Sequence, residues 1–208
     1  MTAHHPIYLF RHGETVWNAE KRAQGHLDSP LTETGRAQAK VMGQELAREL
    51  ARAGFASTEV IVRASPLGRV RETLAIAAEA AGLAHDESSF DHRLREISWG
   101  DWDGLNGQQI EAGWPGALAA RRQNHWNYAP PSGENFPMAT VRAQPALDEI
   151  VALAGERPVT VFAHGMIGRL IRGLFLRAPD AEILAMDQPH DAFFRLHGGA
   201  VARIKAEG

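Results

Sequence analysis

The sequence predicts an α/β fold: a three-layer sandwich in which helices cover both faces of a mostly parallel central sheet. Two apolar, strand-like runs, residues 7–10 and 158–163, each lead into a His-Gly pair, His12-Gly13 and His164-Gly165. Helical patterns alternate with strand patterns, which is typical of sheets covered on both faces. Because ligands of parallel sheets bind beyond the carboxyl ends of the strands, the two His-Gly pairs are predicted to meet in one site.

The first strand and the first helix are marked by their flanking residues. Residues 7–10 are apolar and bounded by polar residues, and a loop follows to about Leu31. Thr32 is placed to cap a helix, and Gly54 is placed to end it. The apolar positions of this helix recur at helical spacing, at Ala37, Val41, Leu46 and Leu50.

Residues 59–63 are predicted to form the second strand. Ser65-Pro66 then supplies a cap and a first-turn residue for an Ala-rich helix that runs to Gly82. From 84 to 104 no clear period is visible. We expect an irregular, lid-like insertion over about 84–135.

The remaining elements follow the same alternation. Within the insertion, short helices are expected at 106–112 and 116–123, before a Pro- and Gly-rich loop at 130–133. Further elements are predicted in the order helix 139–154, strand 158–163, helix 166–176, and a hairpin of 192–196 with 201–205 around Gly198-Gly199. We expect residues 1–208 to form a single domain.

Composition narrows the classes of partner. The chain has 208 residues, of which 44% are hydrophobic and 23% are charged, and its net charge is −3. It therefore lacks the excess of positive charge that is typical of proteins that bind nucleic acid or an anionic membrane. The absence of cysteine excludes disulfides and thiolate metal sites. The ten histidines show no His-Glu-x-x-His spacing, so no metal site is predicted. The amino terminus lacks a signal-peptide pattern, which favours a cytoplasmic location. A homodimer is compatible with the pattern but not required by it.

Several motifs occur in an order that is similar to one known family. They are Arg11-His12-Gly13-Glu14, the segment Asp28 to Gly35, the segment Ser65 to Arg69, the segment Leu94 to Ile97, and His164-Gly165. On these residues the chain resembles the histidine phosphatase superfamily, whose members are phosphoglycerate mutase-like. The resemblance implies the fold predicted above and a phosphatase that forms a phosphohistidine, with no cofactor.

A phosphomonoester is compact and doubly charged, so its site needs dense cationic donors around a nucleophile. His12 suits the nucleophile, because a neutral imidazole can attack through one nitrogen while its other N–H binds a backbone carbonyl. Arg11 and Arg69 are the expected clamps for the phosphoryl oxygens, since guanidinium keeps its charge at any working pH. His164 is expected to act as a third clamp, most effectively when protonated.

Neutral groups are expected to complete the phosphate site. Asn18 and Gln24 match positions where the family places phosphate contacts, although Gln24 could simply hold its loop. Gly13 and Gly165 are expected to bring backbone amides close to the anion. The resemblance assigns the general acid, which then serves as base, to Glu96. The residues alone leave Glu14 and Glu134 equally open.

Other side chains are assigned to surface or core. Arg71, Arg169 and Arg172 are expected on solvated helix faces. The Trp residues at 99, 102, 114 and 126 could wall a pocket, but we expect at least two of them in the core.

Three functional classes remain open. The segment Ala23 to Pro30 and the short insertion are similar to the phosphatase branch, so the main prediction is a phosphoric monoester hydrolase of histidine acid phosphatase type, acting on a small phosphorylated metabolite. Arg121-Arg122 is similar to the basic pair with which mutases hold a carboxylate, so a cofactor-dependent phosphoglycerate mutase is the alternative. A catalytically silent interaction module is the third class, and it predicts a damaged site, whereas every expected position is intact.

Overall fold

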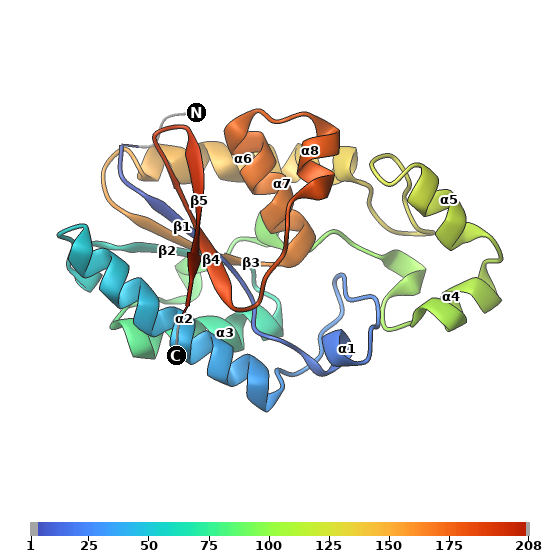
Figure 1. Ribbon diagram of the computed structural model, residues 1–208, viewed down its shortest axis with the longest axis horizontal. Coiled ribbons are helices and arrows are strands. Elements are labelled where there is room, and N and C mark those ends of the chain that lie inside the picture. Colours follow the sequence, from blue (N-terminus) through green and yellow to red (C-terminus); the bar gives the residue numbers. More distant parts are fainter. Residues whose placement is uncertain (1–3, 207–208) are drawn as a thin grey trace.

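The computed structural model describes residues 4–206 and contains one five-stranded sheet in the order β2-β3-β1-β4-β5 (Figure 1). The strands are β1 (Ile7–Arg11), β2 (Ile61–Ala64), β3 (Val159–Ala163), β4 (Ala192–His197) and β5 (Ala200–Lys205). Strand β3 pairs in parallel with both β1 and β2, while β4 pairs antiparallel with β1 and with β5. β4 therefore runs against the other four strands, and the sheet is mostly parallel in direction, as predicted.

Helices cover both faces of this sheet. Helices α2 (Glu33–Arg52) and α3 (Gly68–Ala81) lie on one face, and α6 (Phe136–Leu153) and α7 (Gly165–Leu176) lie on the other (Figure 1). Alternate side chains of β1 separate accordingly, with Tyr8 and Phe10 in the core under α2 and α3 and Ile7 and Leu9 in the core under α6 and α7. The predicted three-layer sandwich is confirmed.

The first two long helices differ in how they begin. Thr32 caps α2 as predicted, since its hydroxyl accepts a hydrogen bond from the Gly35 amide at 3.0 Å. The buried face of α2 differs from the prediction at Ala37, which is exposed. The start of α3 is also later than predicted, because the carboxylate of Asp28 accepts from the amides of Gly68 at 2.6 Å and Arg69 at 3.2 Å. Asp28 therefore replaces Ser65 as the group that satisfies the start of this helix.

The insertion combines irregular chain with two short helices. Three 3₁₀ turns, Glu87–Ser89, His92–Leu94 and Gly100–Trp102, precede α4 (Gly107–Gly113) and α5 (Ala117–Gln123). Helices α4 and α5 lie together at one end of the molecule (Figure 1). Trp102 is fully buried in this region, with its ring 6.2 Å from that of Trp114 and 5.8 Å from that of Tyr128. These aromatic contacts give the insertion a small core.

Two short helices were not predicted, α1 (Val16–Ala19) and α8 (Asp180–Ala185). Helix α6 begins three residues before the predicted start, because the side chain of Asn135 caps the Met138 amide at 2.9 Å. The β4–β5 turn is formed by Gly198 and Gly199, both with positive φ, as a tight hairpin requires. Among the described residues, no helix has both the length and the apolar character needed to cross a bilayer.

Candidate active site

The two His-Gly pairs meet at the carboxyl ends of neighbouring strands. Arg11, the last residue of β1, pairs in register with Ala163, the last residue of β3, so His12 and His164 follow the two strands side by side. Their rings lie 5.3 Å apart. A cavity of about 490 Å³ opens here, and His12 is one of its lining residues. The prediction that the pairs share one place is confirmed.

His12 is held in one orientation. Its Nδ1 lies 2.8 Å from the carbonyl oxygen of Gly13, and its own carbonyl lies 2.9 Å from Nδ1 of His190. Burial lowers the pKa of His12 well below its usual value, and the charges of Arg69 and Arg11 lower it further. The imidazole is therefore neutral at neutral pH. Its Nδ1–H donates to Gly13, which leaves the Nε2 lone pair unprotonated.

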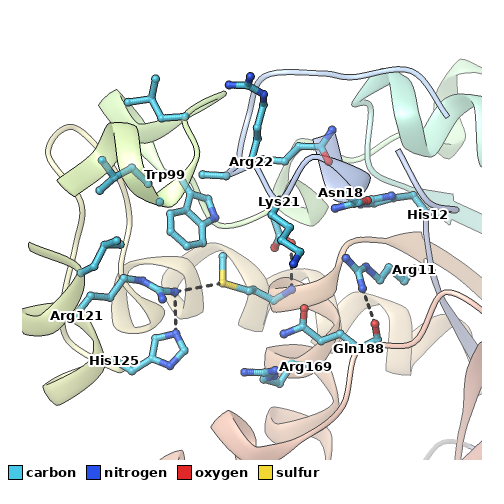
Figure 2. A pocket seen from close by; sticks show the side chains of 18 residues that line it. Arg11, His12, Asn18, Lys21, Arg22, Trp99, Arg121, His125, Arg169 and Gln188 are labelled. Atoms are coloured by element: carbon cyan, nitrogen blue, oxygen red, sulfur yellow. Dashed lines mark hydrogen bonds between the residues drawn. The ribbon is translucent and has the colours of Figure 1, made fainter. Parts of the chain in front are cut away.

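Three donors line the cavity near His12. Arg11 donates through Nη1 to the carbonyl of Gln188, while its buried Nε has no partner among residues 4–206. Burial lowers the pKa of Arg11 to about 10, so the group stays charged at neutral pH. The Gln24 oxygen accepts from the Thr15 hydroxyl at 2.9 Å, and its buried Nε2 likewise has no partner within the described chain. Asn18 also lines the cavity (Figure 2). Unpaired buried donors that face a polar cavity fit an oxyanion.

Arg69 and His164 form a buried layer next to His12. Arg69 donates to Nδ1 of His164 at 3.1 Å, to the carbonyl of Gly25 at 2.7 Å and to the carboxylate of Asp28 at 2.9 Å. His164 Nε2 lies 2.7 Å from the Ser65 hydroxyl. Burial, followed by the charge of Arg69, lowers the pKa of His164 well below its usual value. His164 is thus neutral in this arrangement, in contrast to the protonated clamp expected from the sequence.

Of the three candidate carboxylates, only that of Glu96 lines the cavity. Glu96 lines the cavity, where its carboxylate accepts from the amides of Met166 at 3.0 Å and Ile167 at 2.9 Å, in the first turn of α7. Glu134 pairs with Arg142 instead, and Glu14 accepts from the Thr32 hydroxyl. A carboxylate beside the positive end of a helix is stabilised in position there.

The two glycines differ in function. The Gly13 amide donates to the Thr73 hydroxyl at 3.1 Å, so it does not face an anion as expected. A Cβ at Gly13 would lie 2.2 Å from the carbonyl oxygen of Gly35, which makes close backbone packing the reason for glycine. A Cβ at Gly165 would lie 2.2 Å from the side-chain amide of Gln188 and 3.3 Å from Arg11 Nε, so a larger residue here would displace side chains that line the cavity.

The opposite end of the cavity is also cationic (Figure 2). The Arg121 guanidinium lies 4.4 Å from the centre of the Trp99 ring, and its Nη2 lies 2.7 Å from His125 Nε2. Burial and the charge of Arg169 lower the pKa of Arg121 to about 10, and burial and Arg121 lower that of His125 to about 4. Arg122 is exposed, so the predicted basic pair is divided, as successive residues of a helix point in different directions.

Two further predictions about charged side chains were wrong. Arg169 lines the cavity, and Arg172 is buried, 4% exposed, with its guanidinium 3.7 Å from the centre of the Phe194 ring. The reason is that α7 packs against the sheet and against α8, which leaves it little solvated surface. Arg71 pairs at the surface with Glu87, as expected.

The aromatic prediction is confirmed in part. Of the four Trp residues, Trp102 is fully buried, while Trp126 is partly buried and stacks on Phe136 at 4.8 Å against the core under α6 and α7. Trp99 walls the cavity.

Sequence reasoning missed several residues near the site. His190 and Gln188 come from the connection between α8 and β4, which carries no recognised motif. Arg169 lies in the second turn of α7, which begins directly after the predicted strand end at His164. This position close to the strand end could have identified Arg169 as a residue of the site. Lys21 has a left-handed backbone, φ 55°, and lines the cavity.

The chain belongs to the histidine phosphatase superfamily, branch 1, whose model matches residues 7–199. It is 33% identical over 183 residues to the glucosyl-3-phosphoglycerate phosphatase of Mycobacterium tuberculosis, covering 84% of this chain and 77% of the relative. It is 40% identical over 206 residues to a Salmonella paratyphi C protein named "Probable phosphoglycerate mutase GpmB", covering 95% of this chain and 83% of that one. A solved structure of mycobacterial glucosyl-3-phosphoglycerate phosphatase with VO3 superposes with a TM-score of 0.75 at 31% identity, over 97% of this chain and 96% of that one. Family and relatives support a phosphatase.

Proposed function

We propose that this phosphatase is a phosphoric monoester hydrolase of histidine acid phosphatase type, which cleaves a small phosphorylated metabolite through a phosphohistidine at His12. The observation that carries the proposal is the neutral, oriented His12 imidazole beside unpaired donors of Arg11 and Gln24. Nucleophile and oxyanion donors at one cavity end are what phosphoryl transfer needs. A cytoplasmic location and action as one domain remain predictions from the sequence.

In the first step, the Nε2 lone pair of His12 attacks phosphorus and the ester P–O bond breaks. Glu96, protonated at that moment, gives its proton to the departing oxygen, so an alcohol leaves and a phosphohistidine remains. Nδ1–H of His12 keeps its bond to the Gly13 carbonyl, which spreads the developing charge. Arg11, Asn18 and Gln24 donate to the phosphoryl oxygens.

In the second step, the Glu96 carboxylate takes a proton from a water molecule whose oxygen attacks phosphorus. The N–P bond breaks, phosphate forms, and His12 and protonated Glu96 are regenerated. Glu96 thus acts first as acid and then as base. The carboxylate's fixed position on the Met166 and Ile167 amides supports this double use, since the same group must reach both oxygens.

Arg69 and His164 are proposed to add to the phosphate site, Arg69 as a fixed positive charge and His164 as a hydrogen-bonding partner. Both are buried, 1% exposed, and their donors are engaged with neighbouring groups. Direct contact with phosphate would exchange one of these bonds for a bond to the anion. Gly165 supports the site by leaving space for Arg11 and Gln188.

The substrate is proposed to carry a second oxyanion. Arg121 lies on the side of the cavity opposite His12 (Figure 2), and Arg169 also lines the cavity. Burial lowers the pKa values of both groups, because neither cation has enough negative charge beside it to offset its loss of water. The mycobacterial relatives are named for a phosphoglycerate ester, which contains a carboxylate. A carboxylate could accept two parallel bonds from the planar Arg121 group.

Mutase chemistry is the second candidate, because Arg121 faces the cavity and a relative of 40% identity is named a phosphoglycerate mutase. Hydrolysis and mutase chemistry share the phosphohistidine and differ in which hydroxyl accepts the phosphoryl group.

Phosphate release and product identity over a panel of phosphomonoesters test the proposal. The panel includes 3-phosphoglycerate with and without its bisphosphate primer, and His12→Ala is the control. Release from some esters by the wild type alone supports the phosphatase. Isomerisation of 3-phosphoglycerate with little release would favour the mutase, and equal inactivity of both proteins would refute the proposal.

A further inference from the structure

The segment that carries Glu96 has little regular structure of its own, yet one guanidinium holds three of its carbonyls. Arg142, on α6, donates through Nη1 to the carbonyls of Arg93 at 2.8 Å and Arg95 at 2.7 Å, and through Nη2 to the carbonyl of Glu96 at 2.8 Å. A single side chain thus fixes the backbone on both sides of the proposed acid. The planar fork of arginine suits several acceptors at fixed positions.

Glu134 fixes Arg142 in turn. Its carboxylate accepts from Arg142 Nε at 2.9 Å and from Nη2 at 2.7 Å, and it also accepts from the Ser98 amide at 2.9 Å. Burial raises the pKa of Glu134, but the bonds from Arg142 and Ser98 outweigh this and lower the pKa below its usual value. The Glu134 carboxylate therefore stays charged and holds the Arg142 guanidinium in place.

His26 contacts the same carbonyl oxygen as Arg142. Its Nε2 lies 2.9 Å from the Glu96 carbonyl oxygen and 3.9 Å from a carboxylate oxygen of Glu134. His26 belongs to the loop that also carries Gln24, and its amide bonds to Asp103 at 3.1 Å. The backbone of Glu96 is consequently held by contacts from both the proposed phosphate loop and α6.

We propose that Arg142, locked by Glu134 and supported by His26, is the positioning residue that keeps the Glu96 carboxylate in reach of the leaving oxygen. The inference rests on the proposed function, because it assumes that Glu96 supplies the proton. Proton transfer requires hydrogen-bond reach between acid and acceptor, and a misplacement of about 1 Å can cost about 100-fold in rate. Arg142 itself does not line the cavity, so it acts through the backbone of Glu96.

The test compares two esters that differ in their need for an acid. An alkyl phosphate releases an alkoxide that must be protonated, whereas 4-nitrophenyl phosphate releases a stable phenolate. We expect Arg142→Met to lower kcat/KM for the alkyl ester by about 10- to 100-fold and for 4-nitrophenyl phosphate by less than about threefold. Glu96→Gln should show the same selectivity, and Glu134→Gln should show it in weaker form.

Arg71→Met is the matched control. It removes a bidentate arginine–glutamate pair of the same kind, with Glu87 at 2.9 and 3.1 Å, and Arg71 otherwise donates to the carbonyl of Pro66 and not to residues 93–96. We expect the control to leave both esters unchanged. Tm is measured for every variant, and Glu134→Gln provides the answer if Arg142→Met does not fold.

The outcomes separate the two proposals. Selective loss on the alkyl ester in Arg142→Met or Glu134→Gln supports positioning. Equal loss on both esters, with a lower Tm, would show a merely structural pair and overturn the inference while the phosphatase stands. A wild type that is inactive on both esters, like His12→Ala, would overturn the proposed function and this inference with it.

Discussion

Arg121→Met tests the proposed second anion site most sharply. Methionine keeps an apolar stem of similar length against Trp99 but removes the guanidinium that lies 4.4 Å from that ring. A hydrogen-bonded charged contact is worth about 1.5–3 kcal/mol, and each 1.36 kcal/mol is a factor of ten in rate. We therefore expect kcat/KM for a carboxylated phosphate ester to fall by about 10- to 150-fold.

The assay pairs 3-phosphoglycerate with glycerol 3-phosphate, which replaces the carboxylate by a hydroxymethyl group. The activity on glycerol 3-phosphate, which lacks the carboxylate, should change little in Arg121→Met, because its leaving group makes no ion pair with position 121. Arg122→Met is the control, since Arg122 is the exposed neighbour on the same helix. An equal loss on both esters, or an equal effect of Arg122→Met, would refute the assignment of Arg121 to a carboxylate.

Three further predictions follow from the same contacts. Burial lowers the pKa values of four histidines in and around the cavity below 6.5, and those of His125 and His190 to about 4; the four are His12, His125, His164 and His190. Between about pH 6.5 and 4 the unfolded chain therefore binds more protons than the folded protein, so Tm should fall as the pH drops through this window. A Tm that stays constant over this window would contradict the prediction. Gly165→Ala places a Cβ 2.2 Å from the side-chain amide of Gln188, which must then move within the cavity. Phosphate inhibition should weaken measurably, by up to about tenfold, while the far-ultraviolet circular dichroism spectrum is retained; unchanged inhibition would show that Gln188 moves without disturbing the phosphate site. Excess chelator should leave phosphate release intact because side chains supply the proposed clamp, and a complete, reversible loss would show that a metal is needed.

The parts of the fold set by periodicity were predictable from the sequence. Apolar runs of strand length and the cap at Thr32 depend on neighbours in the chain, so β1, β3 and α2 were found close to their true bounds. The start of α3 was not, because Asp28 satisfies it from 40 residues away in sequence. Contacts of that kind leave no local signal.

The same division applies to the site. The two His-Gly pairs were placed together correctly, since strand ends of a parallel sheet share one edge. The separation of Glu96 from Glu134 required the structure, because only the three-dimensional contact with Arg142 shows that Glu134 is paired. The orientation of Arg121 away from Arg122 depended on how α5 packs against Trp99.

The central claim is a covalent phosphoryl group on His12, and rapid-quench mass spectrometry under alkaline conditions measures it directly. After mixing with a hydrolysable ester, we expect the His12 peptide to gain one phosphoryl group within the first turnover and to lose it as phosphate is released. His12→Ala should never show the adduct. Phosphate release by the wild type at full rate with no acid-labile adduct on His12 would contradict the account.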